Sequence, residues 1–202
     1  MNAPRPDAQE VWVHLLRGNQ RFAAGAQLHP RSRPERREAL LAGQAPTAAV
    51  LGCSDSRIPP ELAFDQGIGD LFTVRTAGEV ADDVVLGSLE FAVTALRVPL
   101  LVVLGHTSCG ALRAAVEVAN GTSSAPEHVR DIVDRVSAAV LGAPAEEASA
   151  VHAREIMRHL PLWSETIAAA LAEEALTIVA AVYSLETGLV TEVGRLPEAV
   201  SR

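Results

Sequence analysis

Four short, mainly apolar runs constrain the fold of this chain more than any other feature of its sequence. They are four to eight residues long and lie at 48–52, 71–74, 100–104 and 176–183. Runs of this length are typical of strands that are buried on both faces of a sheet. Between the second and third runs, apolar residues recur at helical spacing, at Val85, Leu89, Val93 and Leu96. A strand, a helix and a strand in this order predict a right-handed βαβ crossover in a parallel sheet.

The remaining segments fit one α/β domain. Helices are expected at 8–25, 35–41, 109–118, 127–140 and 146–173, and a last strand at 188–193. Asp7, with Glu10 three residues later, resembles a capping box and predicts the start of the first helix. The chain has 202 residues, of which 49% are apolar, so it can bury one substantial core. We therefore predict a single domain over 1–202, with an N-terminal helical arm at 1–45 and an α/β core at 46–202.

The charge and the N-terminus exclude several classes of partner and location. Seventeen basic residues against 25 acidic ones give a formal net charge of −8. Nucleic acids and anionic membrane surfaces both require a basic face, so neither is expected as a partner. The apolar runs are much shorter than the roughly 18–20 residues of a membrane-spanning helix. The N-terminus, MNAPRPDAQE, lacks the apolar core of a secretory signal, which makes the cytoplasm the expected location.

Both cysteines of the chain and one of its six histidines lie at predicted strand ends. Cys53 follows the first apolar run, and His106 and Cys109 follow the third. If these two strands are neighbours, the three side chains meet where ligands bind in open parallel sheets. Two thiolates and one imidazole suit zinc, and three protein ligands leave the fourth tetrahedral position open, as in catalytic sites. Taken singly, Cys53 could equally be a small core residue and His106 a strand-end hydrogen-bonding group.

The other five histidines, at 14, 29, 128, 152 and 159, fall on helices or linkers and are expected to be solvated.

Asp55 and Arg57 follow Cys53 at alternate positions. Alone, they are explained by a turn residue and a surface charge. Beside a metal, a carboxylate can either occupy the open coordination position or accept a hydrogen bond from the metal-bound nucleophile. A bidentate arginine partner would hold Asp55 in the second role.

The motifs CSDSR and GHTSCG, with GDLFTVRTAGE and GSLEFAV between them, resemble the β-class carbonic anhydrases. The resemblance implies a central, mainly parallel sheet and the reversible hydration of CO₂ to bicarbonate and a proton by a zinc-bound hydroxide. It also implies a homodimer or homotetramer in which the N-terminal helix packs on a partner subunit. The zinc ligands would be Cys53, His106 and Cys109, and Asp55 with Arg57 would be the gating pair, Asp55 acting as a fourth ligand only in a closed state.

The same resemblance assigns residues to the substrate pocket. Gln44, nine residues before Cys53, would enter the site of the partner subunit and help to hold CO₂. Phe72 and Ala77 match positions that line the apolar pocket, and the Gly110 N–H would face a bicarbonate oxygen. Phe91 stands where many relatives have a pocket tyrosine.

The chain departs from the family pattern at two positions of the loop after the second strand. Thr76 and Glu79 replace two amides of that loop, so its hydrogen bonds are expected to differ from those of the family.

Two alternative functions are compatible with the same sequence. A hydrolase of carbon disulfide or carbonyl sulfide would keep the same three ligands. A non-catalytic zinc-binding or nucleotide-binding domain is the other alternative, although no glycine-rich phosphate-binding motif is present.

Overall fold

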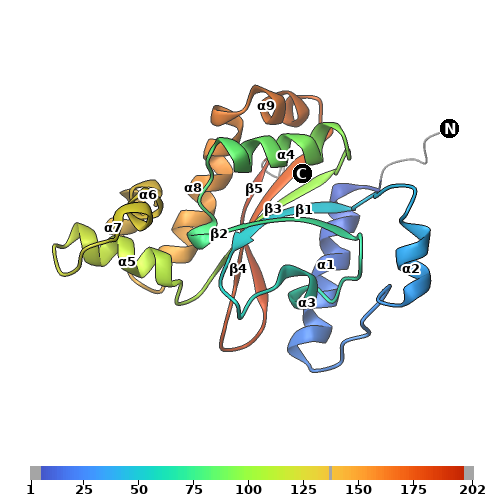
Figure 1. Cartoon of the computed structure of the whole chain (residues 1–202), viewed down its shortest axis with the longest axis horizontal. Helices are drawn as coiled ribbons and strands as arrows, with labels where there is room; N and C mark the ends of the chain where they lie inside the picture. Colours follow the sequence, from blue (N-terminus) through green and yellow to red (C-terminus); the bar gives the residue numbers. More distant parts are fainter. Residues whose placement is uncertain (1–5, 137, 198–202) are drawn as a thin grey trace, which may run out of the picture.

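A five-stranded sheet forms the centre of the protein in a computed structural model that describes residues 6–136 and 138–197 (Figure 1). The strands lie in the order β2-β1-β3-β4-β5. The first four are parallel, and β5 runs antiparallel to β4. Their bounds are β1 Ala48–Cys53, β2 Leu71–Thr76, β3 Leu100–His106, β4 Thr177–Tyr183 and β5 Val190–Leu196. The prediction of one α/β fold around a mainly parallel sheet is confirmed.

The two central strands β1 and β3 are buried along their whole length because helices cover both faces of the sheet. Alternate residues face opposite sides, as the pleat of a strand requires. Ala49 and Leu51 belong to one core cluster, and Ala48 and Val50 belong to the other. This two-sided burial explains why the strands read as continuous apolar runs.

The helices form two covering layers and two outlying groups (Figure 1). One face is covered by α4 Asp83–Thr94, α8 Ala148–Trp163 and α9 Glu165–Ala172, and the other by α1 Ala8–Ala23 and α3 Pro60–Ala63. Beyond the carboxyl ends of the parallel strands lie α5 Gly110–Ala119, α6 Glu127–Arg135 and α7 Ala138–Leu141, whereas α2 Pro34–Ala39 lies on the opposite side of the molecule. Among the described residues, no helix combines the length and the apolar character needed to cross a membrane.

Two of the expected helices are divided. The segment expected at 146–173 breaks at Ser164, which caps α9 by accepting a hydrogen bond from Ile167 N. The segment at 127–140 breaks after Arg135, where α6 ends. Helical periodicity continues across such breaks, so it does not reveal them. The short helices α3 and η1 Ala77–Glu79 contain too few residues to give a periodic signal.

The N-terminal helix α1 packs on the sheet of its own chain. Trp12 is 1% exposed and Leu15 is fully buried, both in the cluster of the second face. Trp12 Nε1 donates a hydrogen bond of 2.6 Å to Glu192 on β5. These residues of the helix therefore pack within the chain. The packing of this helix on a partner subunit, which the family resemblance implied, stays a prediction.

Candidate active site

Two cysteines and a histidine meet at the carboxyl edge of the sheet. Cys53 is the last residue of β1 and His106 the last of β3, and these strands are parallel neighbours. Cys109 is the N-cap residue of α5. The two Sγ atoms are 4.0 Å apart, and the potential ligand atoms of all three residues lie within 4.8 Å of one another. The predicted convergence of these three buried side chains is therefore present.

The geometry of this group fits a metal ion. Two thiolates on a tetrahedral zinc with bonds of about 2.3 Å would have sulfurs about 3.8 Å apart, close to the observed separation. His106 Nδ1 lies 3.0 Å from the carbonyl oxygen of Thr107, an arrangement that places the ring hydrogen on Nδ1. The lone pair of Nε2 then points into the group, and this buried atom has no hydrogen-bond partner among the described residues. An oriented imidazole nitrogen of this kind is what a metal ligand requires.

Hydrogen bonds prepare one of the thiols to ionise. The Sγ atoms of Cys53 and Cys109 share a hydrogen bond of 4.0 Å in which either can donate, and Gly78 N donates to Cys53 Sγ over 3.3 Å. The hydrogen bond with Cys109, with a smaller contribution from Gly78, lowers the pKa of Cys53 to about 4. The same bond raises the pKa of the Cys109 thiol, because the two sulfurs share one proton. The pair thus holds a thiolate at neutral pH, and a bound cation would replace the shared proton.

Asp55 and Arg57 form an ion pair beside this group. Arg57 Nε donates to Asp55 Oδ1 over 2.8 Å and Nη2 to Oδ2 over 2.6 Å. These hydrogen bonds hold the pKa of Asp55 well below its usual range, so the carboxylate is anionic at neutral pH. Its Oδ2 lies 3.9 Å from His106 Nε2. The pairing predicted from the sequence is present, with the carboxylate held next to the ligand set.

Two further residues fix the loop that carries this pair, although no sequence motif indicated a function for them. Arg75 Nε donates to the carbonyl of Cys53 over 2.9 Å, and its Nη2 donates to the carbonyl of Asp55 over 2.6 Å. Gly78 has a φ of 69°, a left-handed conformation that suits glycine. The register of β2 against β1 would have identified Arg75, because it lies opposite Gly52, one residue before Cys53.

Behind the metal group lies a buried polar layer that the sequence predicted poorly. His152 was expected to be solvated, but it is fully buried and its Nε2 lies 2.9 Å from the carbonyl of Gly78. That expectation was wrong because His152 shares the buried face of α8 with Ser149 and Ile156, at helical spacing.

The departures in the loop after β2 have different outcomes. Thr76 Oγ1 donates to the carbonyl of Val80 over 2.8 Å, so its hydroxyl is used within the loop. Glu79 is fully buried, and neither of its carboxyl oxygens has a hydrogen-bond partner among the described residues. Burial raises the pKa of Glu79 well above its ordinary value, because the charged form is desolvated.

The residues predicted for the substrate pocket fall into two separate groups. Ala77 follows Thr76, the register partner of Cys53, and Gly110 follows Cys109, so both lie near the metal group. Gln44 precedes β1 at the opposite edge of the sheet, and β1 alone spans about 16 Å. Phe72 pairs with Ala49 near the start of β1.

Phe91 of α4 belongs to this second, distant group. Its ring centroid is 6.1 Å from that of Phe72. One chain therefore does not bring Gln44, Phe72 and Phe91 to its own metal group.

Comparison with known proteins identifies the family. A carbonic anhydrase family model matches residues 48–190. The chain is 43% identical to carbonic anhydrase 2 of Mycobacterium tuberculosis over 98% of this chain and 100% of that protein. It is 46% identical to a carbonic anhydrase of Mycolicibacterium smegmatis over 93% of this chain and 94% of that protein. The solved structure of the β-carbonic anhydrase CcaA superposes with a TM-score of 0.69 at 25% identity, over 90% of this chain and 94% of that one.

A solved carbon disulfide hydrolase shares the fold at lower similarity. It matches with a TM-score of 0.51 at 19% identity, over 75% of this chain and 80% of that one, so the likeness concerns the fold alone. The family model and the two mycobacterial relatives instead cover the strands and loops that bring Cys53, His106 and Cys109 together. This chain belongs to the carbonic anhydrase family and has the fold of its β class.

Proposed function

We propose that this protein is a zinc-dependent carbonic anhydrase that catalyses the reversible hydration of CO₂ to bicarbonate and a proton. The observation that carries the proposal is the convergence of two sulfurs and one imidazole nitrogen beside an anionic Asp55, in a chain of this family. Zinc is the metal that this donor set favours, because thiolate and imidazole ligands in a tetrahedral arrangement suit it best. When bound, zinc supplies the Lewis acidity that activates water near neutral pH.

Asp55 would orient the attacking water. Its carboxylate is anionic and can only accept hydrogen bonds, so it fixes the direction of a water O–H near His106. Arg57 holds both carboxylate oxygens and so keeps Asp55 from taking a ligand position itself. Rotation of Asp55 away from Arg57 would give the closed state in which Asp55 becomes a fourth ligand.

Arg75 would position the Cys53–Asp55 loop by holding the two carbonyls. At the other side of the site, the N–H of Gly110, at the start of α5, would face a product oxygen.

A second copy of the chain would complete the pocket. Gln44, Phe72 and Phe91 lie too far from the metal group of their own chain to touch a substrate there, so we propose that they act in the site of a partner in a homodimer or homotetramer. Gln44 would hold CO₂, and the two aromatic rings would line an apolar wall beside Ala77. Dilution tests this arrangement, because hydration per chain should fall as the oligomer dissociates while the zinc content stays constant. Constant activity in a demonstrated monomer would contradict it.

Stopped-flow CO₂ hydration on protein with about one zinc per chain tests the function itself. The parent should be active, and Asp55→Ala should keep its zinc yet lose about 100-fold or more in kcat, the usual contribution of a positioned acid–base group. An Asp55→Ala variant that turns over at the parent rate would contradict the role of Asp55. Hydrolysis of carbon disulfide without hydration of CO₂ would instead favour the hydrolase alternative, and zinc binding without either activity would favour a non-catalytic domain. A cytoplasmic location stays a prediction from the sequence.

A further inference from the structure

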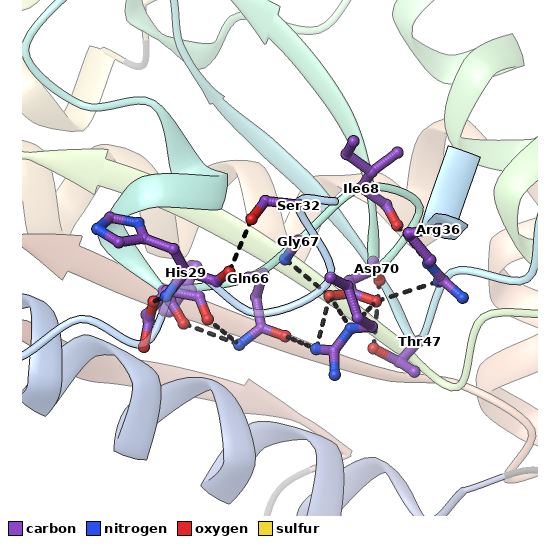
Figure 2. Close-up of polar contacts among 11 residues, drawn as sticks. His29, Ser32, Arg36, Thr47, Gln66, Gly67, Ile68 and Asp70 are labelled. Carbon is purple, nitrogen blue, oxygen red and sulfur yellow. Dashed lines mark hydrogen bonds and ion pairs between the residues drawn. The ribbon is translucent and has the colours of Figure 1, made fainter. Parts of the chain in front are cut away.

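Asp70, in the loop before β2, binds two arginines of the N-terminal arm. Its side chain is only 8% exposed. Arg31 Nε lies 2.7 Å from Asp70 Oδ1, and Arg31 Nη2 lies 2.6 Å from Oδ2. Arg36 Nη2 lies 3.4 Å from Oδ1, and Gly67 N donates to Oδ2 over 2.7 Å. Figure 2 shows Asp70 with Arg36, Gly67 and Thr47 around it, which places one carboxylate at the junction of the arm and the core.

The same loop also binds residues on both sides of Gln44, one through its side chain and one through its main chain. Before Gln44, Arg36 Nε donates to the carbonyl of Ile68 over 2.9 Å. After Gln44, Thr47 N donates to the carbonyl of Asp70 over 2.9 Å. The segment 37–46 between these two anchors contains only the last turn of α2 and the irregular chain leading to β1.

Gly69 permits this close approach. Gly69 has a φ of 80°, a left-handed conformation that suits glycine, and a Cβ atom there would lie 2.6 Å from Leu40 Cδ1, which packs on the loop just after α2. The position of Gln44, whose own side chain is exposed, is therefore set by the contacts of its flanking segments with the loop Gly67–Asp70.

We propose that Asp70 is the positioning residue for Gln44. The proposal rests on the proposed function, in which Gln44 of one copy holds CO₂ in the site of the other. The carboxylate of Asp70 fixes Arg31 and Arg36, its carbonyl fixes Thr47, and the segment between them presents Gln44 in one place. Without the carboxylate, two guanidinium groups lose their common partner and this segment loses its definition, since charge-assisted bidentate pairs combine strength with fixed geometry.

Asp65 provides a matched control, because it is a second buried carboxylate of the core that binds the arm. Its side chain is 1% exposed, and it binds Arg21 together with the backbone N–H groups of Leu28 and His29. Those contacts anchor the arm fifteen residues before Gln44. Loss of Asp65 should destabilise the fold in the same manner as loss of Asp70, but it should leave the segment around Gln44 in place.

A double-mutant cycle between Asp70→Asn and Gln44→Ala tests the proposal. We expect each single variant to lower kcat/KM for CO₂ hydration about tenfold, equivalent to one lost hydrogen bond, with zinc content unchanged. The double variant should fall no more than about twofold below either single one, because the two changes remove the same interaction. Asp65→Asn should keep kcat/KM within about twofold of the parent. Its effect should be independent of Gln44→Ala, so that the loss in the double variant is the product of the two single losses. Thermal unfolding should show that Asp65→Asn and Asp70→Asn lower the melting temperature to a similar degree.

The outcomes separate this proposal from the proposed function. Suppose that Gln44→Ala lowers kcat/KM and that the loss in the double variant is the product of the two single losses. Asp70 is then only structural, and the proposal is overturned. If Gln44→Ala retains the parent kcat/KM, the proposal is overturned as well, while the zinc chemistry stands. A zinc-loaded parent that does not hydrate CO₂ overturns the proposed function itself. Should Asp70→Asn fail to fold, Arg36→Gln replaces it in the cycle, because Arg36 is partly exposed and forms the longer of the two arginine contacts.

Discussion

The replacement Glu79→Gln should stabilise the protein by an amount that grows with pH. Glu79 is fully buried, and no hydrogen bond to its carboxyl oxygens is found among the described residues. In the folded protein, burial raises the pKa of Glu79 well above the value of 4.5 expected for an unfolded chain, and the nearby Cys53 thiolate adds a smaller upward shift. Above pH 4.5 the unfolded state therefore releases a proton that the folded state retains. The stability of the parent is thus greatest below this pH and is lost as the pH rises toward the folded-state pKa.

The size of the effect follows from one proton. Each pH unit in this window costs the parent about 1.4 kcal/mol relative to a glutamine variant that does not titrate. The difference in the free energy of unfolding should therefore grow by about 1.4 kcal/mol for each pH unit between 4.5 and the folded-state pKa of Glu79. Glutamine has nearly the same shape, so packing around η1 is retained.

Denaturant unfolding of the zinc-loaded parent and variant at several pH values measures this difference. Saturating zinc holds Cys53 in one protonation state, which leaves burial as the cause of the shift. Glu186→Gln, in an exposed turn, removes the same charge without desolvation and supplies the baseline. A difference between Glu79→Gln and the parent that does not change with pH would show that Glu79 is ionised in the folded protein, and the reasoning from burial would then be wrong.

Three further substitutions have expected outcomes. Cys53→Ala should lose zinc and lower the melting temperature, because the ligands at the ends of β1 and β3 are no longer linked; zinc analysis and calorimetry check this. Gly78→Ala should weaken zinc binding in a chelator competition and cost about 1 kcal/mol or more of stability, since its φ is 69° and its new Cβ would lie 2.9 Å from that of Ala111. Trp12→Phe should cost about 1.5–3 kcal/mol in denaturant unfolding, because it removes the hydrogen bond to the charged Glu192; an unchanged stability would contradict the packing of α1 on its own chain.

The parts of the fold that the sequence predicts well are those that rest on burial. β1 and β3 are covered on both faces, and short apolar runs like theirs are compatible with few structures other than a buried strand. The metal group is predictable for a related reason. Cys53 and His106 end two such strands, and parallel neighbours place their carboxyl ends at one edge.

The parts that the sequence does not predict depend on long-range contacts. The burial of Glu79 depends on the packing of η1 near His152 of α8, and no local pattern around Glu79 indicates it. The two anchors on either side of Gln44 depend on the path of the arm back to the loop before β2. The family resemblance placed Gln44 in the site of a partner subunit, and the register of β2 on β1 adds that Phe72 also lies away from the metal group of its own chain.

The strand β1 links the two halves of the proposed pocket. Its carboxyl end carries Cys53, and its amino end continues from the segment that Asp70 fixes and that carries Gln44. Because the strand is rigid and spans about 16 Å, a chain cannot fold Gln44 onto its own Cys53 without unpairing β1 from β2 and β3. If Gln44 holds CO₂ as proposed, each copy would give Gln44 to its partner and receive the partner's in return. A dimer with twofold symmetry would meet both requirements through one contact made twice, and a tetramer would contain two such pairs.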